Sequence, residues 1–168
     1  VQGLDIIPAN IELSGAEIEL VGIVGRETVL KEYLGNGLDH YAYVLVDCPP
    51  SLGLLTLNVL TFVHELFIPL QTEFFALQGV SKLLDTYEVV RKRLNNYLEI
   101  TGIIFCMYTS RARLCNEVIE KIREYPPLGH KAFNTIIRKN VKLSESPSHG
   151  KPIISYAPGS HGSEDYIA

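Results

Sequence analysis

The stretch YVLVDCPPSLG, residues 43–53, is the most informative part of the sequence for the fold. It begins with four consecutive apolar residues, Tyr43 to Val46, a pattern typical of a strand buried on both faces of a parallel sheet. Asp47 follows directly and would lie at the carboxyl rim of that strand, where open α/β sheets bind their ligands. An alternative is that Asp47 only caps the following turn.

On both sides of this stretch, strand-like and helix-like segments alternate along the chain. The pattern predicts strands at 4–8, 43–46, 66–70, 100–107 and 131–137, helices at 14–34, 54–62, 77–94, 116–124 and 162–168, and a long loop at 140–158. The first helix would begin at Ser14, with Glu17 completing a capping box. The alternation predicts an α/β fold with a mainly parallel sheet, formed by residues 1–168 as a single domain.

The composition excludes several classes of protein. The 168 residues are 46% hydrophobic and 20% charged, which favours a globular domain over a disordered chain. No apolar run approaches the roughly 18–20 residues that span a bilayer. The three cysteines form no CxxC pair and the five histidines are scattered, so a disulfide framework or a metal site is not expected.

The charge is unevenly distributed. The whole chain has a net charge of −4, which argues against a simple nucleic-acid-binding protein. The stretch from Arg111 to Lys151, however, contains nine basic and four acidic residues, a net charge of +5 that leaves −9 for the remainder. This asymmetry indicates either a localised anionic partner or a solvated basic face.

Several longer stretches together resemble the ParA/Soj family of chromosome- and plasmid-partitioning ATPases. They are residues 43–58, 68–79 and 140–152, with shorter matches at 7–10 and 15–20. The resemblance covers nearly the whole chain and implies a three-layer fold of the P-loop NTPase type. No GxxxxGK[ST] motif occurs, so the N-terminal strand and the P-loop are expected to be missing. The chain then corresponds to the C-terminal two-thirds of such an ATPase domain and is not expected to bind or hydrolyse ATP alone.

The resemblance also implies roles for individual residues in binding ATP and magnesium. Asp47 matches the switch II aspartate, which acts in catalysis and in the second shell of the magnesium ion. Pro49 matches the loop near the phosphates. Arg138 and Asn140 match the adenine pocket, where Arg138 stands in place of the proline of the family. Met107 ends a predicted strand at the rim where that pocket lies, or is a buried residue that fills the core.

A second implied surface binds DNA. Arg111 and Lys142 match basic residues that the family uses for non-specific DNA binding, and Arg113 and Lys139 are close to them in sequence. The resemblance further implies an ATP-dependent homodimer and a ParB/Spo0J-type partner that stimulates hydrolysis. The expected location is the cytoplasm, on the nucleoid and away from membranes.

Two other interpretations remain open. The chain could be a non-catalytic module that binds DNA or a partner without a P-loop. It could also belong to a MinD-like ATPase that cycles on and off membranes, which would require an amphipathic helix at the C-terminus.

Overall fold

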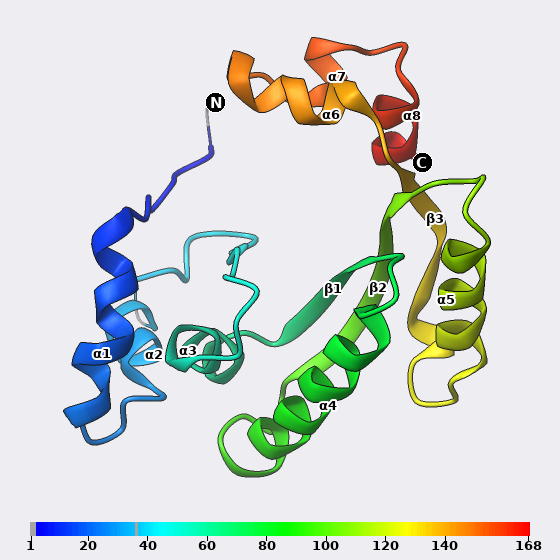
Figure 1. Cartoon of the computed structure of the whole chain (residues 1–168). Helices are drawn as coiled ribbons and strands as arrows, with labels where there is room; N and C mark the ends of the chain where they lie inside the picture. The colour runs from blue at the N-terminus through cyan, green and yellow to red at the C-terminus, as the bar shows by residue number, and fades with distance from the viewer. Residues whose placement is uncertain (1–2, 36) are drawn as a thin grey trace. The chain divides into compact units, whose positions relative to one another are not determined.

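The computed structural model describes residues 3–35 and 37–168. The chain divides into two compact units (Figure 1). The first unit comprises residues 1–64 and 86–98, and the second comprises residues 65–85 and 99–168. Helix α4, Ala76–Arg93, contributes to both units.

The second unit is built on a parallel sheet. Its strands are β1 (Glu65–Gln71), β2 (Glu99–Tyr108) and β3 (Ala132–Arg138), hydrogen-bonded in that order. The central strand has a neighbour on each side, and its residues Ile103 and Phe105 are fully buried. These strands confirm the predictions at 66–70, 100–107 and 131–137, and with them the α/β class with a parallel sheet.

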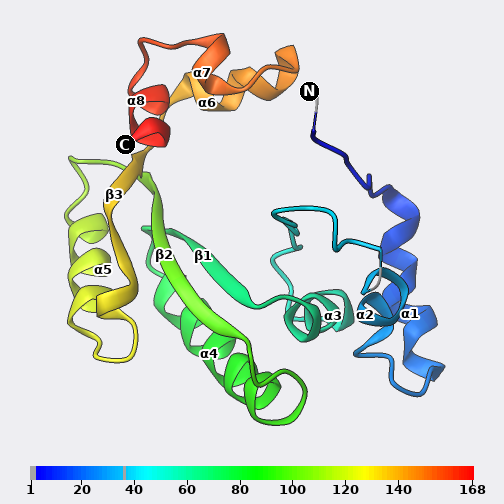
Figure 2. The same ribbon diagram turned by 180° about the vertical axis from the view of Figure 1, so that it is seen from behind.

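Two helices of this unit lie side by side on one face of the sheet. They are the first part of α4 and α5 (Arg113–Glu124), as both views show (Figures 1 and 2). The buried residues of α5 are Cys115, Val118, Ile119 and Ile122, a helical spacing that places them on a single face. On the sheet, the rings of Phe67 and Phe133 meet edge to face at 6.2 Å beside Gly102, where a Cβ would overlap Phe133.

The segment after β3 is helical rather than a loop. It forms α6 (Val141–Glu145), a 3₁₀ helix (Ser146–His149), α7 (Ile153–Tyr156) and α8 (His161–Ile167). The prediction of a loop at 140–158 is therefore wrong, whereas the helix predicted at 162–168 is confirmed. Asn140 caps α6, and Gly150, with φ of 59°, ends the 3₁₀ helix. The helices of this segment are four to seven residues long, which is too short for a periodic apolar pattern to be visible in the sequence.

The first unit contains short helices. They are a 3₁₀ helix (Ile11–Gly15), α1 (Ala16–Glu19), a second 3₁₀ helix (Leu20–Gly22), α2 (Val29–Leu34) and α3 (Leu54–Phe62). The single helix predicted at 14–34 is wrong, because the chain turns at Gly25 with φ of 73°. The predicted capping box is also absent, since Asn10 caps the first turn through a 2.9 Å bond from the Glu12 amide. The helix predicted at 54–62 is confirmed.

The strands predicted at 4–8 and 43–46 are wrong. Neither stretch pairs with any strand among the described residues, and the side chains of Ile6 and Leu45 are 75% and 92% exposed. A strand forms only where a neighbouring strand satisfies its main-chain hydrogen bonds, so an apolar, β-branched composition is not sufficient.

Candidate functional site

The carboxyl ends of β2 and β3 bring two predicted stretches together within the second unit. Tyr108 lies opposite Arg138 in the sheet register, and the main-chain N–H of Lys139 donates to the carbonyl of Tyr108 at 2.9 Å. Met107 precedes this junction and Asn140 follows it. The residues predicted for an adenine pocket, and the basic residues next to them, are thus placed at one edge of one sheet.

Met107 has an unusual backbone at this edge. Its φ is 56°, a left-handed conformation that it alone shows among the described non-glycine residues, and its side chain is half exposed. A left-handed conformation costs an L-residue roughly 1–2 kcal/mol. Backbone strain of this kind is concentrated at functional sites, so the position is a candidate for ligand contact.

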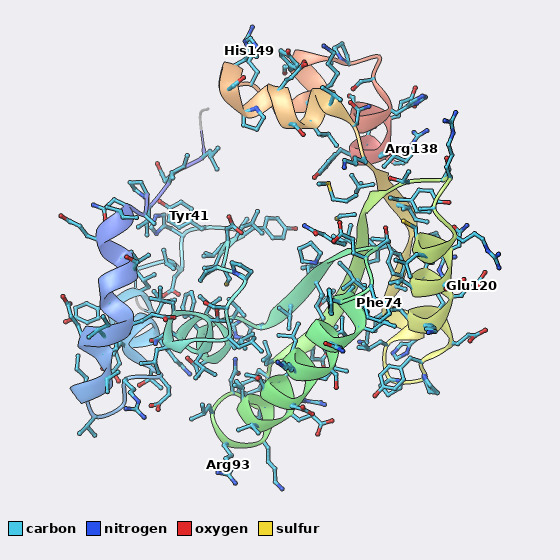
Figure 3. The ribbon with its side chains drawn as sticks, in the orientation of Figure 1. Tyr41, Phe74, Arg93, Glu120, Arg138 and His149 are labelled. Atoms are coloured by element: carbon cyan, nitrogen blue, oxygen red, sulfur yellow. The ribbon has the colours of Figure 1, made fainter. Side chains whose placement is uncertain are left out.

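Arg138, which is labelled in Figure 3, is held by two carboxylates of α8 (His161–Ile167). Its Nε lies 3.0 Å from each carboxylate oxygen of Asp165, its terminal Nη2 lies 2.6 Å from Asp165 Oδ1, and its main-chain N–H donates to Oδ2 at 2.9 Å. A weaker contact joins Nη2 to Glu164 at 3.3 Å. These bonds raise the pKa of Arg138 and lower the pKa of Asp165. The guanidinium therefore ties α8 to the end of β3.

Of the two hydrogen-bonding groups in the Asn140 side chain, only the NH₂ group remains available to contact a base. Its side-chain oxygen already accepts a hydrogen bond of 2.8 Å from the Lys142 N–H, which caps α6. Its side-chain NH₂ donates to no described residue and remains able to donate to one acceptor of a base. The chemistry of Asn140 therefore suits one hydrogen bond to an adenine edge.

The four predicted DNA-binding cations are all exposed but differ in their partners. Arg111, Arg113 and Lys139 form no ion pair within the described part of the chain. Lys142 lies 2.8 Å from the carboxylate of Glu145, which raises the pKa of Lys142. The surface thus combines three uncompensated cations with one compensated cation.

Asp47 and Pro49 lie in the first unit, in an irregular stretch between α2 and α3. Both are exposed. Burial first, and then the charge of Asp47, raise the pKa of the neighbouring Cys48 thiol. No group of three or more metal-ligating side chains occurs among the described residues, so a magnesium role for Asp47 remains a prediction. Mg²⁺ keeps several of its waters when protein carboxylates bind it, so an exposed carboxylate such as Asp47 can contact the ion or its bound waters.

The sequence contains no P-loop motif of the kind that holds the phosphates of a nucleotide. The stretch Gly22–Thr28 contains two glycines but lacks the lysine of a P-loop. It begins at the end of a 3₁₀ helix rather than after a strand. Within the second unit, the side-chain NH₂ of Asn140 suits a hydrogen bond to a base, whereas the sequence contains no P-loop motif to hold phosphates.

Sequence reasoning missed the acidic partners of this surface. Asp165 and Glu164 are about 26 residues from Arg138, and no local pattern connects them. Glu145 could have been found, because Lys142 and Glu145 are three residues apart, a spacing that pairs charges on a helix.

Comparison with known proteins shows the family of the chain. A family described as an AAA domain matches residues 1–100. The chain belongs to this AAA-domain family. It is also 49% identical over 167 residues to the sporulation initiation inhibitor protein Soj of Bacillus subtilis, and 51% identical over 166 residues to the chromosome-partitioning ATPase Soj of Treponema pallidum. Each match covers 99% of this chain, which spans 65% of each relative, and shows homology to Soj proteins.

A solved structure supports the same fold. The cobyrinic acid a,c-diamide synthase of Mycobacterium smegmatis, crystallised with ADP and magnesium, is 33% identical, with a TM-score of 0.74. The match covers 95% of this chain and 57% of that structure. Together these comparisons identify the sheet as part of a P-loop NTPase-type fold. No described helix is long and apolar enough to cross a membrane.

Proposed function

We propose that this chain is part of a Soj/ParA-type ATPase that acts in chromosome or plasmid partitioning. The observation that carries this proposal is the 49–51% identity to two Soj proteins over 99% of the chain. The adjacent basic stretches at the ends of β2 and β3 are consistent with it.

ATP and magnesium are the proposed cofactors of the complete protein. A bound nucleotide would supply the free energy that separates two conformational states. In this chain, the NH₂ group of Asn140 would donate to the base, Met107 and Arg138 would border it, and Asp47 with Pro49 would face the magnesium shell. The ADP and magnesium bound to the 33% identical structure support the choice of a nucleotide and magnesium as cofactors.

The proposed DNA contacts come from Arg111, Arg113, Lys139 and Lys142. Phosphate binding needs mobile cations rather than base-reading geometry, so the expected binding is independent of sequence and weakens with salt. An ATP-bound homodimer would hold DNA in the cytoplasm, on the nucleoid. A ParB/Spo0J-type protein would trigger hydrolysis and release.

A mobility-shift assay tests the DNA part of the proposal. The variant Arg111→Glu with Lys142→Glu should lose most of its DNA retention at low salt, because two phosphate contacts become repulsive. Unchanged retention would contradict the assignment. Heat-unfolding curves of both proteins serve as the control for folding.

A second candidate is a non-catalytic module that binds DNA or a partner. The observation that favours it is that the 168 residues contain no GxxxxGK[ST] motif. The upstream reading frame and ATP turnover by these 168 residues separate the two candidates. Turnover without such a motif would make Gly22–Thr28 the first segment to mutate.

A further inference from the structure

Four side chains in the segment after β3 form a cluster around Glu145. The carboxylate oxygen Oε2 of Glu145 accepts hydrogen bonds from Lys142 Nζ at 2.8 Å and from the Tyr156 hydroxyl at 3.0 Å. The His149 ring stacks on the Tyr156 ring at 4.9 Å, and the Lys142 ammonium lies 5.9 Å from the centre of the same ring. We call these four residues the Glu145 cluster; Figure 3 labels His149 within it.

The cluster gives Lys142 an internal counterion. The bonds from Lys142 and Tyr156 lower the pKa of Glu145, and the bond to Glu145 raises the pKa of Lys142, so the pair is charged at neutral pH. Arg111, Arg113 and Lys139 have no such partner among the described residues. Lys142 is therefore the one cation of the four that an anion can engage only in competition with a carboxylate.

We propose that Glu145, oriented by Tyr156, restrains Lys142 and thereby weakens DNA binding until a phosphate displaces the carboxylate. This inference rests on the proposed function, because it assumes that the basic surface binds DNA. Lys142 would then have to break its ion pair with Glu145 to bind a phosphate, whereas the other three cations have no ion pair among the described residues to break. A protein that must release DNA during each cycle benefits from such a limit on affinity.

Tyr156 allows the restraint to be tested without a change of net charge. Its hydroxyl donates to the same oxygen that accepts from Lys142, so it holds that oxygen in position. The stacked His149 in turn holds the Tyr156 ring. Removing the hydroxyl should loosen Glu145 and leave every charge in place.

The experiment measures the affinity of the full-length protein, with ATP and magnesium, for a random-sequence DNA duplex across a salt series. Glu145→Gln should tighten binding about 3- to 10-fold at low salt and steepen the salt dependence by about one counterion. Tyr156→Phe should tighten it by about twofold. In a Lys142→Gln background, Glu145→Gln should give no gain beyond that of Glu120→Gln. Glu120→Gln is the matched control, because Glu120 is an exposed carboxylate on α5 and makes no ion pair among the described residues (Figure 3).

Several outcomes would overturn the inference. A gain from Glu145→Gln that equals that of Glu120→Gln, or that persists in full without Lys142, would show that Lys142 is not restrained by Glu145. No gain, in a protein whose DNA binding Arg111→Glu abolishes, would reject the restraint but keep the proposed function. DNA binding that is absent in every variant would reject both. A gain in affinity for polyglutamate but not for DNA would assign the surface to an acidic protein and reject the restraint on DNA binding.

Discussion

Different kinds of hydrogen bond stabilise the interior of each of the two units. In the second unit, main-chain groups of three neighbouring strands satisfy one another. In the first unit, the side-chain amide of Asn58 donates to the carbonyls of Arg26 and Leu54 and accepts from the Leu30 N–H. Asn95 likewise donates to the carbonyls of Leu60 and Val63. Where no strand is paired, buried amide side chains connect the helices instead.

The same contrast separates two apolar runs of similar composition. Residues 103–105 lie between two strands and are mostly buried, whereas residues 43–46 have no paired strand and Leu45 is 92% exposed. Position next to other strands, rather than residue type, decides which run becomes part of a core.

The largest expected effect tests this contrast directly. Phe105→Ala should lower the free energy of unfolding by about 3–5 kcal/mol, because it leaves a cavity at a fully buried position. Leu45→Ala should change it by less than about 0.5 kcal/mol. Urea unfolding of both variants measures the difference. A loss of more than about 2 kcal/mol for Leu45→Ala would mean that residues 43–46 are buried in solution.

The second prediction concerns the amide that holds the first unit. Asn58 is 4% exposed, and Asn58→Ala leaves the Leu30 N–H and two carbonyls without their partner, at a cost of about 2–3 kcal/mol. Hydrogen exchange should show faster exchange in α2 and α3, with β2 unchanged. Equal acceleration in β2 would show that the two units unfold together and would remove the contrast between them.

The sequence predicted the elements whose pattern is complete within a short window. Three strands, and α3, α4 and α5, fall within a few residues of the predicted bounds. The failures depend on information far away in the chain or on single residues. The stretches 4–8 and 43–46, predicted as strands, pair with no other strand among the described residues. The apolar spacing of residues 14–34 is typical of one helix, but the turn at Gly25 interrupts it.

The candidate site was predictable in part for the same reason. Met107, Arg138 and Asn140 meet because parallel strands end at one edge of a sheet, which alternation alone indicates. The carboxylate of Asp165 was not predictable, since a helix 27 residues further along the chain delivers it. Arg138, the departure from the family pattern, is also the residue that this distant helix binds.

Asp165 gives a third prediction, on the polar edge of the second unit. Its side chain is 10% exposed, and Asp165→Asn should cost about 1–2 kcal/mol at pH 7, since it weakens several bonds to Arg138. The folded pKa is lowered, so this stability is complete above the unfolded value of about 3.9 and is lost as the pH falls through the folded pKa. Urea midpoints from pH 7 to pH 3 should converge for wild type and variant. Asp39→Asn, at an exposed site in the first unit, is the control, and a pH-independent difference would contradict the charge argument.

The smallest effect concerns Met107, where the ordered sheet meets the candidate site. Met107→Gly should be neutral or stabilise by up to about 1 kcal/mol, because glycine accepts φ of 56° and the half-exposed side chain loses little burial. Met107→Val should cost about 1–2 kcal/mol, since a β-branched side chain fits this conformation worst. Heat unfolding ranks the three proteins. If valine is tolerated as well as methionine, the left-handed backbone is not maintained in solution, and the argument from strain to ligand contact at Met107 fails.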